Sequence, residues 1–223
     1  MTTEELERLR VLEEKVKDYE EIKKRLQVTE DIIEIDRLEK IYGYYLDNGQ
    51  MHKIVDLFSD NTESIEIGDR GVFKGKEGVR KFFFGYLSRG SGGKDLQELP
   101  PGKLAFHMQH QGVVTVDPGG QTAKGRWYLV MIQARPIEQG GPTRSILGHG
   151  VYENEFVKED GVWKFQKMFM SLHYRSPIAE GWAVMPNMAV GNAVGRDSEP
   201  TFYHPYPNMK LLPFHWKHPV TGQ

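Results

Sequence analysis

Residues 104–136, LAFHMQHQGVVTVDPGGQTAKGRWYLVMIQARP, contain the strongest indication of the fold. Two long runs with strand character, Leu104–Val116 and Thr122–Pro136, flank the segment Asp117-Pro118-Gly119-Gly120. Aspartate, proline and glycine favour tight turns because they preset or tolerate the backbone angles that turns require. The stretch therefore predicts two long antiparallel strands joined by a short connection.

A second pair of strands is predicted further along the chain, with Ile146–Lys158 and Val162–Tyr174 joined by Glu159-Asp160-Gly161. The sequence before residue 104 is mainly helical in pattern, with predicted helices over residues 29–47, 52–58 and 76–87 and one hairpin over residues 62–74. Helices followed by long antiparallel strands are typical of an α+β domain in which a curved sheet wraps against the helices. The Gly- and Pro-rich segment 88–102 is expected to be a loop and a candidate lid.

Both ends of the chain extend beyond this domain. Residues 4–28 predict a long exposed helix with coiled-coil spacing of its apolar residues, which fits either packing on its own domain or pairing with another subunit. Residues 177–223 lack periodicity but are rich in aromatics, so we expect this tail to be pinned across the domain or onto a neighbouring subunit. The chain is thus divided into an N-terminal helix (1–28), a central domain (29–176) and an extended aromatic- and Pro-rich tail (177–223).

The composition excludes several classes of function. The 223 residues include 29 basic and 31 acidic side chains, a near-neutral balance that argues against a nucleic-acid surface. The absence of cysteine excludes disulfides and thiolate metal ligands. No apolar stretch approaches the roughly 20 residues that cross a bilayer, and the charged N-terminus is unlike a secretory signal. We expect a cytoplasmic protein with no membrane or nucleic-acid partner.

Three polar side chains near the end of the helix predicted over residues 29–47 are candidates for chemistry. Tyr42 and Tyr45 are three residues apart and share one face, and Asp47 lies close to the helix C-terminus. A carboxylate there faces the negative end of the helix dipole, which is unfavourable and suggests a use elsewhere. The alternative is structural, with two core tyrosines and a solvated aspartate.

The two long strands supply further candidates. His107 and His110 are three residues apart on one strand, so only one of them can face the interior. Arg126 and Trp127 are adjacent on the next strand, so one faces inward and the other outward. An inward Arg126 would be a buried cation that needs a partner such as Asp47 or a substrate phenolate. An outward Arg126 would be an ordinary charged residue of the solvent face.

His149 and His173, on the last two predicted strands, are weaker candidates. No metal site is expected, because neither His-x-His nor His-Glu-x-x-His spacing occurs. The glycines form neither a dinucleotide fingerprint nor a phosphate-binding loop, and there is no Gly-x-Ser-x-Gly elbow. Tyrosine, aspartate, histidine and arginine can move protons and hold an oxyanion by themselves. This combination favours a lyase without a cofactor.

The order of elements and four stretches of sequence resemble the SnoaL-like branch of the NTF2-like (cone) superfamily over residues 29–176. The stretches are residues 42–47 (YGYYLD), 71–79 (GVFKGKEGV), 107–127 and 152–164. The resemblance implies a cone of curved antiparallel sheet around an apolar, aromatic-lined pocket. The long N-terminal helix and extended tail look most like the subgroup that contains the diarylpropane lyases, which release formaldehyde from lignin-derived dimers without a cofactor. The superfamily also contains scytalone dehydratase, isomerases and members without known activity.

The resemblance implies roles for individual residues. In the dehydratase relatives a tyrosine and an aspartate of the first domain helix and a histidine of the sheet surround the substrate, and Tyr42, Asp47 and His107 match these positions. His107 would then be the principal acid and base, with Asp47 orienting it. Tyr42 or Tyr45 would hydrogen-bond the departing oxygen, and Arg126 would hold a phenolate.

Further side chains are expected to contact the substrate. In the subgroup a histidine often stands near residues 167–168 of the final strand, whereas here Phe169 takes that place and the histidine of the strand is His173. The predicted substrate-binding residues are Trp127, His149, His173, Phe169 and Phe83.

The function implied is a cofactor-independent lyase that eliminates water and/or formaldehyde from a phenolic, lignin-derived diaryl compound to give a stilbene-type product. A dehydratase or isomerase of a polycyclic or steroid-like substrate and a non-catalytic binding module are the alternatives. The predicted partners are a small aromatic substrate and, because the N-terminal helix has a self-associating pattern, further copies of the chain in a dimer or trimer.

Overall fold

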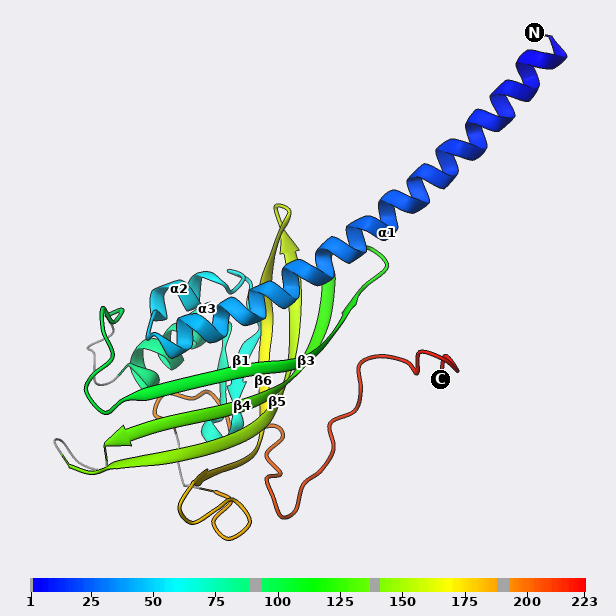
Figure 1. Ribbon diagram of the computed structural model, residues 1–223. Coiled ribbons are helices and arrows are strands. Elements are labelled where there is room, and N and C mark those ends of the chain that lie inside the picture. The colour runs from blue at the N-terminus through cyan, green and yellow to red at the C-terminus, as the bar shows by residue number, and fades with distance from the viewer. Residues whose placement is uncertain (1, 89–93, 137–140, 188–192) are drawn as a thin grey trace.

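The computed structural model describes residues 2–88, 94–136, 141–187 and 193–223. One long helix, α1 (Thr3–Asp47), leads into a domain of six strands and short helices (Figure 1). Two helices were predicted here, with a boundary near residue 28, but the helix is continuous. Neither glycine nor proline occurs between Thr3 and Tyr42, so nothing in the sequence interrupts the backbone hydrogen bonds.

Short elements follow α1. They are α2 (Met51–Asp56), β1 (Ser64–Ile67), the 3-10 turn η1 (Gly68–Arg70), β2 (Val72–Lys74), α3 (Gly75–Arg80) and the π-helical turn η2 (Lys81–Leu87). The four long strands are β3 (Leu104–Val116), β4 (Thr122–Pro136), β5 (Thr143–Glu159) and β6 (Val162–Pro177). The predicted bounds of β3 and β4 are confirmed, and β5 and β6 are longer than predicted.

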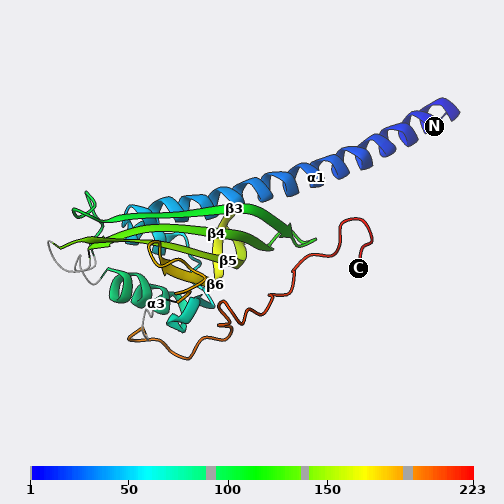
Figure 2. The same cartoon turned by 60° about the horizontal axis from the view of Figure 1, so that its bottom comes forward.

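The six strands form one sheet in the order β2-β1-β6-β5-β4-β3. Neighbouring strands are antiparallel except β1 and β6, which are parallel. The long strands curve around the C-terminal half of α1, which lies along β3 (Figure 2). The predicted class, an α+β cone of curved sheet packed on helices, is confirmed.

The core fills the space between the sheet and the helices. Its largest fully buried side chains are aromatic: Tyr42, Phe58, Phe73, Phe82, Phe83, Trp127, Tyr152, Phe156 and Phe165. Two indole N–H groups bind carboxylates of α1, because Trp127 donates to Asp36 over 3.0 Å and Trp163 donates to Asp31 over 2.9 Å. These hydrogen bonds satisfy polar atoms that would otherwise be buried without partners, and they fix the helix against the sheet.

The N-terminal half of α1 projects beyond the domain (Figure 1). Every side chain from Thr2 to Glu30 is exposed, including the apolar residues Leu9, Leu12, Val16, Tyr19 and Leu26. Of the two arrangements that the sequence allowed, packing of this segment on its own domain is therefore wrong for the single chain. None of the described helices is both long and apolar enough to cross a membrane.

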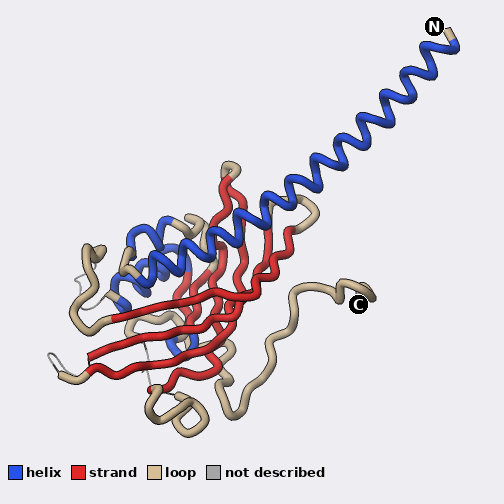
Figure 3. The backbone as a smooth tube through the Cα atoms, viewed as in Figure 1, coloured by secondary structure: helices blue, strands red, loops and turns tan. Residues whose placement is uncertain are grey.

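The C-terminal tail has no helix or strand in its described residues after β6 (Figure 3). It is nevertheless fixed to the domain by specific contacts. The backbone N–H of Thr201 donates to Glu66 over 2.7 Å, and the N–H of Tyr206 donates to the carbonyl of His173 over 2.8 Å. Further along, Arg126 donates to the carbonyl of Pro213. The tail is thus pinned across its own domain, one of the two predicted arrangements.

Candidate active site

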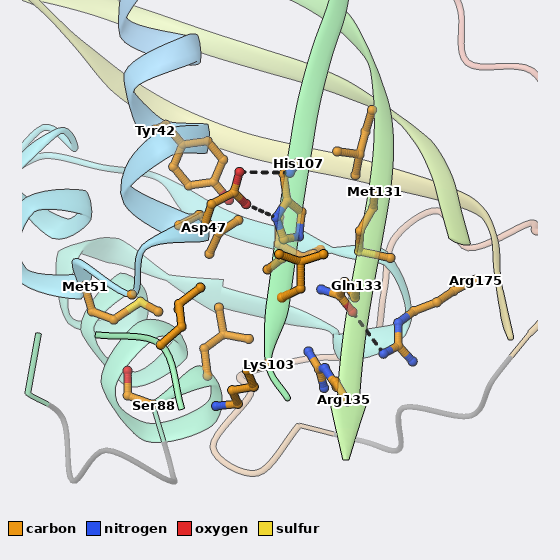
Figure 4. A pocket seen from close by; sticks show the side chains of 18 of the residues that line it. Tyr42, Asp47, Met51, Ser88, Lys103, His107, Met131, Gln133, Arg135 and Arg175 are labelled. Atoms are coloured by element: carbon orange, nitrogen blue, oxygen red, sulfur yellow. Dashed lines mark hydrogen bonds and ion pairs between the residues drawn. The ribbon is translucent and has the colours of Figure 1, made fainter. Parts of the chain in front are cut away.

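The cone contains a cavity of about 220 Å³ between α1, α2, η2 and the inner face of the long strands (Figure 4). Its walls are mainly apolar and include Leu46, Met51, Ile67, Phe82, Leu129, Met131, Met170 and Leu172. The candidate lid contributes Leu96, Leu99 and Pro100 to the wall, and its residues 89–93 lie outside the described part of the chain. An apolar cavity with a few polar groups is typical of a site for a small hydrophobic ligand.

Asp47 and His107 meet at one end of this cavity (Figure 4). The ring Nδ1 of His107 lies 2.6 Å from Oδ1 of Asp47, and the backbone N–H of His107 donates to Oδ2 over 3.1 Å. The carboxylate therefore holds both the ring and the backbone of the histidine. Because the carboxylate of Asp47 accepts a hydrogen bond from the proton on Nδ1, the Nε2 atom of neutral His107 carries no proton and has a free lone pair. No described residue hydrogen-bonds this Nε2, which leaves it available to a ligand.

The chain reversal after α1 explains how these residues meet. Asp47 is the last residue of the helix, and Gly49 adopts a positive φ of 66° that a residue with a side chain rarely adopts. A Cβ at Gly49 would also lie 2.6 Å from Leu96. Leu96 in turn donates its backbone N–H to the carbonyl of Gly49 over 3.2 Å. The glycine thus allows the wall segment to close against the helix end beside Asp47.

Tyr42 and Tyr152 line the cavity next to this pair. Their hydroxyl groups lie 3.5 Å apart and both rings are fully buried. Burial raises the pKa of Tyr42 and the pKa of Tyr152 well above the usual value for a phenol. Both side chains are therefore neutral near pH 7, so they can donate a hydrogen bond but cannot act as bases.

Glu39 lies one turn before Tyr42 on the buried face of α1. Its side chain is inaccessible to solvent, and Oε2 accepts a hydrogen bond of 2.8 Å from Nδ2 of Asn154. Oε1 has no hydrogen-bond partner among the described residues. Burial raises the pKa of Glu39 to about 8, so this carboxyl group is mainly protonated at neutral pH.

The opposite end of the cavity is basic (Figure 4). Arg70, Lys103, Arg135 and Arg175 line it together with Gln133. Arg175 donates to Oε1 of Gln133 over 3.2 Å. The inward direction of Arg175 depends on a β-bulge, because the register of β5 and β6 shifts between His149 and Gly150 and leaves His173 unpaired.

Arg126 does not reach the cavity, contrary to the prediction. It lies on the outer face of β4, where it pairs with Glu153 and donates to the carbonyl of Pro213. Its guanidinium also lies 5.0 Å from the ring of Phe214 and 5.2 Å from the ring of Trp216. Arg126 therefore anchors the tail, and the phenolate role predicted for it is wrong.

Trp127, Phe83 and Tyr45 do not line the cavity either. Trp127 faces inward but is fully buried under α1, where its N–H binds Asp36. Phe83 is buried in the core with its ring centroid 6.4 Å from that of Tyr42. Tyr45 is half-buried against the edge of the core, and Nζ of Lys53 lies 5.5 Å from its ring. The substrate-binding roles predicted for Trp127 and Phe83 are therefore wrong, and so is the catalytic role predicted for Tyr45.

His149, His173 and Phe169 lie on the outer face of the sheet, so their predicted contact with substrate is also wrong. The Nδ1 atoms of the two histidines are 3.0 Å apart. Phe169 packs against Phe202 of the tail. Burial lowers the pKa of His149, and burial together with His149 lowers the pKa of His173 to about 4. These side chains support the tail rather than the cavity.

The sequence analysis missed Tyr152, Gln133, Glu39 and the basic residues Arg70, Lys103, Arg135 and Arg175. A signal existed for Arg135 and Gln133, since both share the inward alternation of Leu129 and Met131 on β4. Glu39 could also have been identified, because it interrupts the apolar face of α1 three residues before Tyr42. No local signal places Arg70 or Arg175, which depend on a turn and a bulge.

The fold and the cavity define the class of protein: a cone of the NTF2-like type with a hydrogen-bonded aspartate–histidine pair at its cavity. The model of the SnoaL-like domain matches residues 27–168, more than half of the chain. The chain belongs to the SnoaL-like family. No curated protein matches its sequence. Within the described residues, no three His, Asp or Glu side chains converge as metal ligands.

Solved structures confirm the fold. A putative scytalone dehydratase of Novosphingobium aromaticivorans is 16% identical, with a TM-score of 0.55, and the match covers 76% of this chain and 97% of that one. The dehydrochlorinase LinA is 20% identical, with a TM-score of 0.56 and coverage of 75% and 99%. A type 3 hexachlorocyclohexane dehydrochlorinase of Novosphingobium barchaimii is 18% identical, with a TM-score of 0.53 and coverage of 75% and 99%.

Proposed function

We propose that the protein is a cofactor-independent lyase that eliminates water and/or formaldehyde from a phenolic, lignin-derived diaryl compound to give a stilbene-type product. One observation carries the proposal: the Asp47–His107 pair presents an unoccupied ring nitrogen to an apolar cavity. A base with a hydrogen-bonded carboxylate behind it, in a largely water-excluding space, is suited to removing a proton from a bound organic molecule.

In the proposed chemistry, each of the three polar side chains Tyr42, His107 and Asp47 has one role. For a diaryl propanediol, neutral Tyr42 donates a hydrogen bond to the benzylic hydroxyl as it departs as water. Nε2 of His107 accepts the proton of the terminal hydroxyl, the carbon–carbon bond to that carbinol breaks, and formaldehyde leaves. The electrons of the broken bond form the stilbene double bond as the benzylic carbon–oxygen bond breaks, and the proton that His107 accepted passes to the departing hydroxide, which leaves as water. Asp47 stabilises the imidazolium between these steps.

The names of the structural neighbours support an elimination. One is named as a putative scytalone dehydratase and others as dehydrochlorinases. Because the identity of these neighbours to this chain is low, their names do not indicate its substrate. Simple dehydration of a polycyclic substrate is the second candidate, since it needs the same proton acceptor and the same hydroxyl donor.

The test is incubation of the purified protein, with a chelator present, with a phenolic diarylpropane diol. Formaldehyde and the ultraviolet absorption of a stilbene are measured together. Both products in equal amounts are the expected result. Water loss without formaldehyde would assign the protein to the dehydratases, and no conversion of this or a polycyclic alcohol would favour the non-catalytic binding module.

The exposed half of α1 leads to a further expected result, a homo-oligomer. Leu9, Leu12, Val16, Tyr19 and Leu26 repeat at coiled-coil spacing, and the domain covers none of them. Light scattering of the full chain should give a dimer or trimer mass, and the double variant Leu12→Glu/Val16→Glu should give a monomer. Lys17→Glu, which lies off this apolar seam, is the control that should keep the wild-type mass. A monomeric wild-type chain would contradict the expectation.

A further inference from the structure

Three guanidinium groups converge on the end of the cavity that faces away from the Asp47–His107 pair. Arg70 comes from η1, Arg135 from β4 and Arg175 from β6. Three separate elements thus bring positive charge to one place. The packing of the apolar walls around it does not explain this concentration of charge. The proton-transfer chemistry proposed above uses none of these side chains.

One carboxylate of the described residues pairs with this cluster. It belongs to Asp69, whose Oδ1 lies 3.8 Å from Nη1 of Arg70. Arg70 otherwise donates from Nη1 to the carbonyl of Ile67 over 3.2 Å, and its buried Nε has no hydrogen-bond partner among the described residues. Arg135 forms no ion pair with any described carboxylate. Among the described residues, Arg70 and Arg135 therefore bring more positive charge to this end of the cavity than Asp69 compensates.

The charges also act on one another. Burial lowers the pKa of Arg175 to about 10, and the charges of Arg135 and Arg70 contribute to this shift. Loss of hydration lowers the pKa of Arg135, and Arg70 lowers it further. Arg135 and Arg175 still carry their charge near pH 7, so the folded protein maintains repulsion that a bound anion would relieve.

We propose that this end of the cavity binds an ionised carboxylate of the substrate, which places the reacting carbon atoms toward His107. The inference rests on the proposed function and narrows its substrate class to aromatic carboxylates. Guanidinium groups match a carboxylate with two parallel hydrogen bonds, and Gln133, held by Arg175, has an amide N–H group to add. A phenol is mostly neutral at pH 7, because its pKa is about 10, so it would leave the positive charges uncompensated.

Binding of two isosteric probes tests this without requiring turnover. trans-Stilbene-4-carboxylate and trans-stilbene-4-carboxamide have the same shape but differ in charge, and their dissociation constants are measured by calorimetry at pH 7.5. The wild-type protein should bind the carboxylate at least about tenfold more tightly, a typical effect of a charge-assisted hydrogen bond. Arg135→Gln should reduce this preference several-fold, and it should fold because Arg135 lies at the exposed mouth of the cavity.

Arg80→Gln is the matched control, since Arg80 is exposed on α3 and does not line the cavity. Its preference for the carboxylate should equal that of the wild type. Equal binding of the two probes by the wild type would overturn the inference, as would binding of 4-hydroxystilbene as tightly as the carboxylate. A preference that appears without any turnover would uphold the carboxylate site while contradicting the lyase, so the two proposals fail separately.

Discussion

His107→Gln is expected to lower turnover of the diaryl substrate by about 10³-fold, within the range that general acid–base groups contribute. Glutamine occupies similar volume and can still donate to Asp47, but it offers no nitrogen that accepts a proton near pH 7. Asp47→Asn should lower turnover by about 10²-fold, because the amide no longer accepts the Nδ1 proton and no longer stabilises the imidazolium. The rates are measured from formaldehyde release at saturating substrate, so that weaker binding does not enter the comparison.

The matched control for this prediction is His110→Gln. His110 lies on the same strand but is exposed on its outer face and does not line the cavity. Its substitution should leave turnover within twofold of the wild type. Near-full activity of both His107→Gln and Asp47→Asn would show that another group moves the proton.

Glu39→Gln is expected to make the stability of the protein much less dependent on pH. The folded protein raises the pKa of Glu39 from 4.5 to about 8, so folding favours the protonated carboxyl. The contribution of this group to stability is complete below pH 4.5 and is lost as the pH rises through about 8. Above pH 8 the wild type must bury a carboxylate of which one oxygen has no partner among the described residues, whereas glutamine stays neutral and can still accept the hydrogen bond from Asn154.

Thermal unfolding between pH 6 and pH 9 measures this effect. Relative to the variant, the wild type should lose on the order of 10 °C in Tm over that interval, since about 3 kcal/mol corresponds to such a shift in a chain of this size. Glu34→Gln is the control, because Glu34 is exposed on the same helix and its curve should follow that of the wild type. Parallel curves for the wild type and Glu39→Gln would contradict the prediction.

Local chemistry made much of the sheet predictable. β3 and β4 have their predicted bounds because the aspartate, proline and glycines between them determine a turn by themselves. The choice between Arg126 and Trp127 was not predictable, because alternation says that two neighbours point apart but not which one faces the core. That choice depends on Asp36, which lies on a helix far away in the sequence and accepts the indole N–H of Trp127.

The candidate site, too, was predictable from the sequence only in part. Asp47 and His107 were identified from helix and strand positions and from the family resemblance, and their hydrogen bond arises from packing of α1 along β3. The basic end was missed because its members come from a turn, a strand and a segment beyond a bulge. Counting alternate residues from the inward Leu172 places Arg175 on the outer face, and only the bulge at His173 reverses that result.

Because of the bulge at His173, the outer face of β6 can change without a change on the face that lines the cavity. This position is an extra residue that pairs with nothing on β5, so its loss would restore regular pairing without turning Arg175 away from the cavity. Such a deletion would remove one partner of the histidine pair beneath the tail and leave the charges that meet a ligand unchanged. Deletion of this one residue is therefore expected to reshape the surface that the tail covers while ligand preference stays constant.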